Sequence, residues 1–186
     1  MIIKRLILIS VLCFLFNIMC SIILLNLFNL HPWRVFAHYY GIGFILVYVH
    51  YLGHSKWGGL WRKQHVIHHH IRCYPYKKFL SIGPYKTLNI PIYKDGNIWM
   101  FLVPALLGCL LLSTNFMELI GMIIFSLIIL IREDLLHKMI HTSPRGNNII
   151  FETLRELHYL HHKGDMKCNY GFCDPFHDWV LGTLKF

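Results

Sequence analysis

The sequence has few acidic residues and no paired cysteine motif. Only 9 Asp and Glu residues stand against 18 Lys and Arg, and the six cysteines include no C-x-x-C pair. The sequence therefore shows neither a disulfide framework nor a zinc-finger spacing. No basic run is interleaved with aromatic residues on a soluble scaffold, so we expect no nucleic-acid partner despite the positive charge.

Long apolar runs dominate what is present. Hydrophobic residues make up 55% of the 186 positions, which is typical of a membrane protein. The first run, 6–30, is long enough to span a bilayer, and we interpret it as a retained anchor because it exceeds a signal-peptide core and lacks a small-x-small cleavage site. A second run covers 35–52. Two shorter runs, 98–112 and 116–131, predict either a tight transmembrane hairpin or a pair that dips partway into the bilayer.

The segment between the second and third runs is polar and basic. Its first part, 57–71, is expected to be a helix. The remainder resembles a segment that lies along the membrane interface, because amphipathic aromatic side chains favour that position. These aromatic residues are Tyr74, Tyr76, Phe79, Tyr85 and Tyr93.

The distribution of basic residues predicts the topology. If the first two runs both cross the membrane, 17 of the 18 basic residues share one side and Arg34 alone lies on the other. This asymmetry marks the basic side as cytoplasmic. We therefore expect an all-α, multi-pass integral membrane protein with about four transmembrane helices, the last two a short hairpin, and a cytosolic helical cap. In a eukaryotic host the endoplasmic reticulum membrane would be its location.

Ten of the fourteen histidines fall into four groups with helical spacing. Positions i, i+3 and i+4 of a helix lie within about 100° of one another, so each group can turn its imidazoles toward one point. The groups are His50 with His54, His65 with His68 and His69, His137 with His141, and His158 with His161 and His162. His70 follows the first triplet directly and is expected to point away from the ligand face.

The grouped imidazoles predict a di-metal site. Imidazole is the commonest metal-binding side chain near neutral pH, and ten of them could hold two ions with four or five ligands each. Nitrogen ligation alone does not choose between zinc and iron. A nitrogen-rich site at the end of a lipid-embedded bundle, without hydrolytic partners, favours iron and oxygen activation against a hydrocarbon chain.

The order of the four histidine groups resembles that of the fatty acid hydroxylase/sterol desaturase superfamily of membrane di-iron oxygenases. Leu60-Trp61-Arg62 resembles the family's lead-in to the first triplet, and Asn169-Tyr170-Gly171 followed by 178–183 resembles its closing motif. The resemblance runs from about His50 to Thr183. His177 stands where the family usually has tryptophan, and Leu181 replaces the usual phenylalanine.

The resemblance implies a four-helix membrane scaffold with a cytosolic site of two iron ions, which oxidises an unactivated C–H bond of a lipid. The ten histidines carry over as metal ligands. The single domain, 1–186, would comprise an N-terminal anchor at 1–34 and a catalytic core at 35–183. Because ligating histidines usually donate their second N–H to an oriented acceptor, the candidates for that role are Asp134, Asp174 and Asp178.

The electrons for such a reaction would come from another protein. The sequence contains no G-x-G-x-x-G, no C-x-x-C-H and no H-P-G-G motif. We therefore expect an external donor such as cytochrome b5 or a ferredoxin-type protein, for which the basic cytosolic face offers a docking surface.

Three alternatives remain open at the level of sequence. The same site could desaturate a lipid instead of hydroxylating it. A histidine-rich membrane protein that binds or transports metal, zinc for example, would need polar groups along its spans, and Glu118 is the only acidic residue inside the four apolar runs. An inactive relative is the third alternative, which His177 leaves open.

Overall fold

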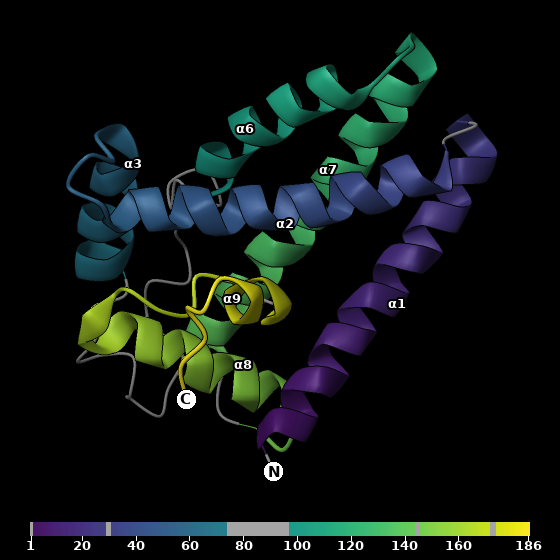
Figure 1. Ribbon diagram of the computed structural model, residues 1–186. Coiled ribbons are helices and arrows are strands. Elements are labelled where there is room, and N and C mark those ends of the chain that lie inside the picture. Colours follow the sequence, from purple (N-terminus) through teal and green to yellow (C-terminus); the bar gives the residue numbers. More distant parts are fainter. Residues whose placement is uncertain (1, 29–30, 74–96, 144–145, 172–173) are drawn as a thin grey trace.

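The computed structural model describes residues 2–28, 31–73, 97–143, 146–171 and 174–186, and within these ranges all regular structure is helical (Figure 1). The long helices are α1 (Ile2–Phe28), α2 (Pro32–His54), α6 (Asn97–Leu112) and α7 (Phe116–Thr142). The short helical elements are α3 (Leu60–Arg62), η1 (Lys63–Cys73), α8 (Ile149–Leu160), η2 (His161–Asp165) and α9 (Phe176–Val180). The all-α prediction is confirmed. The expected interfacial segment, 74–96, lies outside the described residues.

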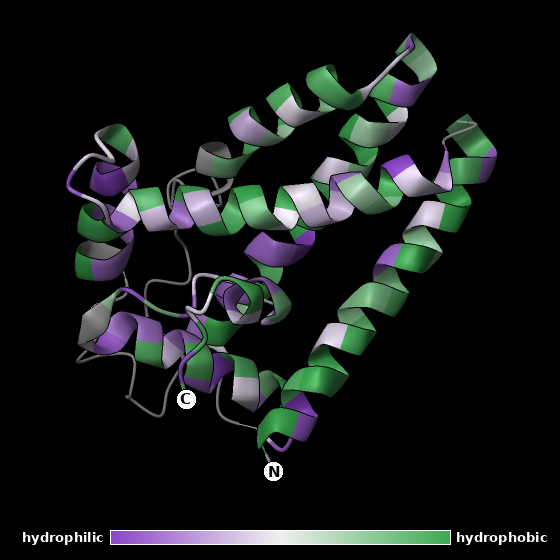
Figure 2. Cartoon of the chain, viewed as in Figure 1, coloured by the Kyte–Doolittle hydropathy of each residue, from purple (hydrophilic) through white to green (hydrophobic). Residues whose placement is uncertain are grey.

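Within the described ranges, α1 and α2 are the two helices that are long and apolar enough to cross a membrane. Figure 2 shows hydrophobic residues along almost the whole length of α1. Large apolar side chains of α1 are mostly exposed, as at Ile7, Met19 and Leu27, which are 59%, 61% and 66% exposed. An apolar surface of this extent is suited to contact with lipid tails. These features indicate a membrane protein.

The first turns of α2 and α7 lie on the same side of the molecule, at the right of Figure 1. An ion pair joins these two helix starts: Arg34 Nη1 lies 2.7 and 2.9 Å from the two carboxylate oxygens of Glu118. Glu118 also accepts hydrogen bonds from the backbone N–H and the hydroxyl of Thr114, at 2.8 and 2.7 Å. Helix α7 starts here because the side chain of Asn115 accepts a hydrogen bond from the backbone N–H of Glu118 in its first turn.

Two apolar clusters hold the helices in register. The larger joins α2, α6 and α7 through side chains such as Ile42, Phe101 and Phe125. The smaller packs α8 against α1 and the end of α7, through residues such as Ile9 and Leu157. Packing on both sides of α7 therefore brings the ends of α2, α7 and α8 that carry histidines to one region.

The segment that carries the first histidine triplet is not an ordinary α-helix. The expected helix at 57–71 begins only at Leu60, and from Lys63 to Cys73 it is a π-helix. A π-helix bonds residue i to residue i+5, so it is wider than an α-helix and residues five apart come onto one face. Helix α7 continues beyond the apolar run that ends at 131, as far as Thr142, and carries His137 and His141, the pair with helical spacing, on its last turns.

Replacing Glu118 with glutamine should destabilise the bundle without disturbing the histidines at its other end. The substitution keeps the size of the side chain but removes the charge that Arg34 neutralises, at an expected cost of about 1–3 kcal/mol. Thermal unfolding in detergent should show a lower melting temperature, with unchanged metal content. Glu156→Gln, at an exposed position of α8, is the control, and equal melting temperatures for the two variants would contradict the structural role of the ion pair.

Candidate metal centre

Ten histidines form two groups of five at the ends of α2, α7 and α8. Within each group the candidate ligand atoms all lie within 4.8 Å of one another. The first group draws on α2, η1 and η2 and consists of His50, His54, His65, His70 and His161. The second draws on η1, α7, α8 and η2 and consists of His69, His137, His141, His158 and His162.

The nitrogens of the first group meet at short range. His161 Nε2 lies 3.0 Å from the Nε2 atoms of both His50 and His54, and His65 and His70 approach each other by the same distance. Four of these five side chains are buried and His54 is half-buried. The segment after α8 thus closes over the end of α2.

The second group contains a triangle of nitrogens. The Nε2 atoms of His137, His141 and His158 are separated by 3.0, 3.2 and 3.0 Å. His162 Nε2 lies 3.0 Å from that of His158. The two groups are neighbours, because the rings of His70 and His162 stack with their centroids 3.9 Å apart.

The structure brings together nine of the ten predicted histidines, and it differs from the prediction at His68 and His70. His70 was expected to point away but joins the first group, whereas His68 is half-buried and belongs to neither group among the described residues. The reason is the π-helical backbone of η1, which places His65 and His70, five residues apart, on one face. The spacing H-x-x-H-H was interpreted with α-helical geometry, and the run of three consecutive histidines was the available hint of an alternative.

Burial favours the neutral form of four of the clustered histidines, which lie on α8, η1 and η2. It lowers the pKa of His65, His158 and His162 well below the usual value, and the charges of neighbouring histidines lower it further. Burial also lowers the pKa of His161, to about 4, although a hydrogen bond to the backbone of Cys168 raises it. A neutral imidazole retains the lone pair that a metal ion requires.

Two backbone carbonyls orient imidazoles of the first group. His50 Nδ1 donates to the carbonyl of Tyr170 at 2.6 Å, and His161 Nδ1 donates to that of Cys168 at 2.8 Å. With the proton held on Nδ1, the lone pair of each ring lies on Nε2, which faces the other histidines. Sequence patterns do not reveal these acceptors, because they are main-chain atoms.

The closing motif of the sequence holds these carbonyls in place. Asp178 accepts hydrogen bonds from the N–H groups of Tyr170 and Gly171 at 2.8 and 2.6 Å, and from the hydroxyl of Thr183 at 2.6 Å. Asn169, whose φ of 53° is in the left-handed region, bonds to the backbone of Leu157 and of Lys185. The motif thus ties the end of α8 to the C-terminal segment.

The three acidic residues proposed to orient ligands occupy different places. Asp178 acts on the loop that receives the N–H of His50, as described above. Asp174 binds Tyr39, Ser10 and the N–H of Phe176, so its bonds anchor the C-terminal segment to α1 and α2. Asp134 forms an ion pair with Lys138 at 3.3 Å, and its role toward His137 stays a prediction.

The nitrogen positions fit metal ions. Two ligand atoms at right angles around an ion, each about 2.1 Å away, are separated by about 3.0 Å. This is the separation found repeatedly in both groups. Both groups of five could therefore hold a metal ion, and the assignment of individual histidines as its ligands stays a prediction.

Comparison with known proteins agrees with the resemblance seen in the sequence. No curated protein and no solved structure matches the chain. Residues 35–183 match the family described as Fatty acid hydroxylase, a range that includes all ten clustered histidines and the closing motif. The chain therefore belongs to the fatty acid hydroxylase family.

Proposed function

We propose that the protein is a membrane di-iron oxygenase that hydroxylates an unactivated C–H bond of a lipid, such as a fatty acyl chain, an acyl chain within a sphingolipid, or a sterol. Membership of the family implies an oxidoreductase. The observation that carries the proposal is the pair of adjacent five-histidine groups, built almost wholly of buried imidazoles. The site contains no hydrolytic nucleophile in either group, and two neighbouring ions suit a reaction that needs two electrons.

The number of histidines in each group supports iron over structural zinc. Structural zinc sites are almost always four-coordinate, whereas each group offers five histidine nitrogens that lie within 4.8 Å of one another. Imidazole is also a ligand that suits iron.

The chain's own residues supply ligands, orientation and exclusion of water. We propose as ligands the nine clustered histidines of the sequence prediction together with His70. Iron ions bound there would supply oxygen activation. The carbonyls of Cys168 and Tyr170 fix the tautomers of two ligands, and burial of the rings keeps bulk water from the reaction.

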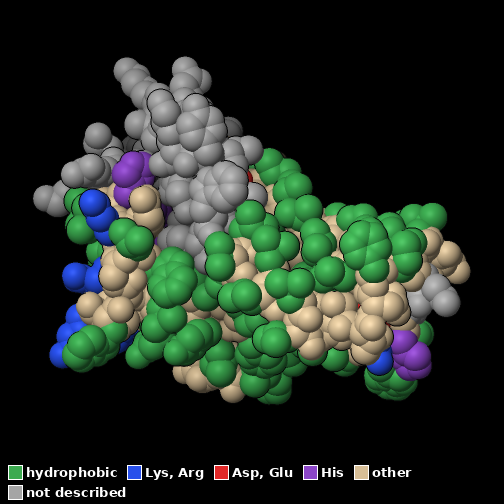
Figure 3. Space-filling view, turned by 90° about the horizontal axis from the view of Figure 1, so that it is seen from above, with side chains coloured by type: hydrophobic (Ala, Val, Ile, Leu, Met, Phe, Trp, Pro, Cys, Tyr) green, Lys and Arg blue, Asp and Glu red, His purple; other side chains and the backbone are tan. Residues whose placement is uncertain are grey.

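The electron donor is proposed to bind on the cytosolic side. Lys56, Arg62 and Lys63 are exposed around the segment that links His54 to His65, and basic side chains gather at the same end of the molecule in Figure 3. Such a surface suits an acidic donor such as cytochrome b5 or a ferredoxin-type protein. If α6 and α7 form a transmembrane hairpin, the histidine-bearing end of the four long helices lies on the cytosolic side of the membrane. In a eukaryote this membrane would be that of the endoplasmic reticulum.

Desaturation is the alternative outcome of the same chemistry, because both reactions begin with hydrogen abstraction. Metal transport is a weaker alternative. Glu118, the acidic residue within the apolar runs, is engaged with Arg34 and Thr114, so it serves the packing of the helix ends.

In the direct test, purified, iron-loaded protein in lipid nanodiscs is incubated with ¹⁸O₂, a reduced electron donor and a lipid extract. A hydroxylated lipid that carries one ¹⁸O atom should appear by mass spectrometry and should be absent with His161→Ala. A new double bond without ¹⁸O would establish desaturation. No oxidised lipid from protein that contains two irons would overturn the proposed function.

The π-helical geometry of η1 yields a paired prediction on metal content. His70→Ala should lower the iron bound per chain, with a loss of affinity of at least about tenfold, because it removes a nitrogen from the first group. His68→Ala, two positions away in the same helix, should leave iron content close to wild type. Mass spectrometry of the bound metal measures both, and the opposite order of effects would show that this segment binds metal as an α-helix.

A second prediction concerns the support of His50. Asp178→Asn weakens the hydrogen bonds that hold the Tyr170 carbonyl, so iron affinity should fall about 10- to 100-fold, as when other partners of ligands are removed. Titration with a competing chelator measures this affinity. Glu156→Gln, an exposed acid on α8, should have no effect, and an unchanged affinity in Asp178→Asn would remove the proposed orienting role of the closing motif.

A further inference from the structure

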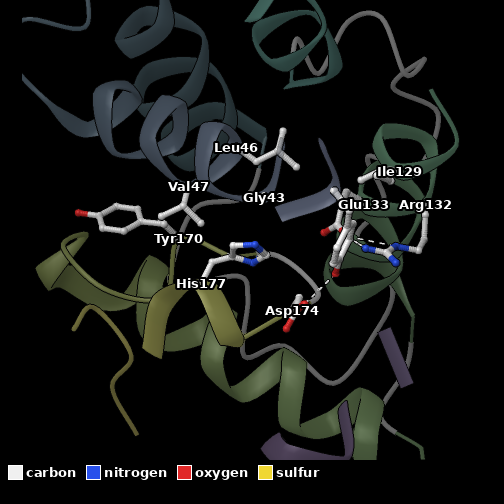
Figure 4. A pocket seen from close by; sticks show the side chains of 11 residues that line it. Gly43, Leu46, Val47, Ile129, Arg132, Glu133, Tyr170, Asp174 and His177 are labelled. Atoms are coloured by element: carbon white, nitrogen blue, oxygen red, sulfur yellow. Dashed lines mark hydrogen bonds and ion pairs between the residues drawn. The ribbon is translucent and has the colours of Figure 1, made fainter. Parts of the chain in front are cut away.

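A small cavity lies beside the metal centre, between α2, α7 and the C-terminal segment (Figure 4). Its volume of ≈ 30 Å³ suffices for about two water-sized groups. Its walls combine apolar and polar side chains, and they consist of Tyr39, Gly43, Leu46, Val47, Ile129, Arg132, Glu133, Tyr170, Gly171, Asp174 and His177.

One polar atom of this wall lacks a partner. His177 is only 3% exposed, and its Nε2 forms no hydrogen bond among the described residues. The other polar side chains are engaged: Glu133 pairs with Arg132, and Asp174 accepts from Tyr39 and Ser10. A buried nitrogen without a partner costs free energy unless a ligand or water satisfies it.

The backbone of α2 leaves room for this nitrogen. A Cβ atom at Gly43 would lie 2.0 Å from His177 Nε2, so the absence of a side chain at position 43 allows the ring to reach the cavity. In Figure 4 the ring of His177 projects between Gly43 and the side of the cavity that carries Glu133 and Asp174. The fit of the two residues indicates a built position for the imidazole.

The protonation of the ring identifies what the nitrogen can bind. Burial lowers the pKa of His177, although the carboxylate of Asp174 and a hydrogen bond to the backbone of Asp174 raise it. The ring is therefore neutral at pH 7. Because the bond to the backbone carbonyl uses the proton on Nδ1, Nε2 carries a lone pair and accepts a hydrogen bond. A hydroxyl group donates such a bond, whereas an ether or a carbonyl oxygen does not.

The cavity is close to the proposed reaction site. Leu46 and Gly43 precede His50 on α2 by four and seven residues, which places them roughly 6 and 10 Å from it along the helix axis. Glu133 precedes His137 on α7 by four residues, again roughly 6 Å. Tyr170 is one of the residues that line the cavity, and its carbonyl accepts the N–H of His50. A group bound at His177 would thus lie a few carbon–carbon bonds from a carbon held at the metal centre.

We propose that this cavity binds a hydroxyl group of the lipid substrate, with His177 Nε2 as the acceptor of its hydrogen bond. The inference rests on the proposed function and narrows its substrate class. The substrate is a lipid that already carries a hydroxyl group within a few carbons of the C–H bond to be oxidised. His177 is therefore a residue that determines specificity, and Gly43 makes its position possible.

A matched pair of probes tests the proposal without requiring turnover. The probes are 1-hexadecanol with a mid-chain photoactivatable diazirine and the methyl ether of the same compound, which lacks the donor. Iron-loaded protein in detergent is photolabelled with each, and the yield is measured by intact-protein mass spectrometry. Wild type should favour the alcohol on the order of fivefold, as expected for one hydrogen bond.

The variants separate the role of the nitrogen from general packing. His177→Phe should reduce the preference for the alcohol to about onefold, whereas His177→Gln, whose amide oxygen accepts a hydrogen bond, should retain part of it. His31→Asn, at an exposed position before α2, should keep the full preference. Gly43→Ala adds a methyl group on α2 that pushes the ring of His177 out of its position, so this variant should lose the preference for the alcohol. It replaces His177→Phe in the test if that variant fails to fold.

Equal labelling of wild type by alcohol and ether, or a preference that persists in both His177→Phe and Gly43→Ala, would overturn the hydroxyl site. The proposed function is read separately from the ¹⁸O-labelled product. A preference for the alcohol without oxidised lipid would leave the hydroxyl site standing and remove the oxygenase. Oxidised lipid without the preference would do the reverse.

Discussion

The burial of nine imidazoles and the half-burial of a tenth, His54, against one another is the constraint on which the structure depends. Removing so many polar rings from water is costly unless metal ions or hydrogen bonds compensate them. The ends of α2 and α7, the π-helix η1 and the α8–η2 segment all converge on this point. The apolar cluster between α2, α6 and α7 and the Arg34–Glu118 ion pair hold these helices together away from the histidines.

The C-terminal segment acts as a bracket for the first group of histidines. Asp178 and Asn169 hold the loop whose carbonyls receive the N–H groups of His50 and His161. A main-chain acceptor cannot change protonation, so it holds the tautomer of a ligand more constantly than a carboxylate would. The resemblance of this motif to the family's closing sequence therefore has a structural reason, although the acceptors themselves are not side chains.

Much of the fold could be predicted because the long helices coincide with runs of hydrophobic residues. The runs at 35–52 and 98–112 agree closely with α2 and α6. The apolar run at 116–131 covers only part of α7, because apolar character stops at Arg132, whereas the helix continues through Glu133 and Asp134, which have basic partners. The helical spacing of His137 and His141 was the sign of this continuation. The exchange of His68 for His70 was not predicted, because a π-helix depends on packing that residue spacing does not reveal. The cavity at His177 likewise requires Gly43, far away in the sequence.

Sequence neighbours are divided between the two groups: His69 and His70 face different groups, as do His161 and His162. A backbone segment that is fixed by one group therefore fixes a histidine of the other as well. A metal ion bound in either group would order the backbone of both, so the second ion would bind with a smaller loss of conformational entropy. The expected behaviour is cooperative loading, in which chains that hold two ions or none outnumber chains that hold one.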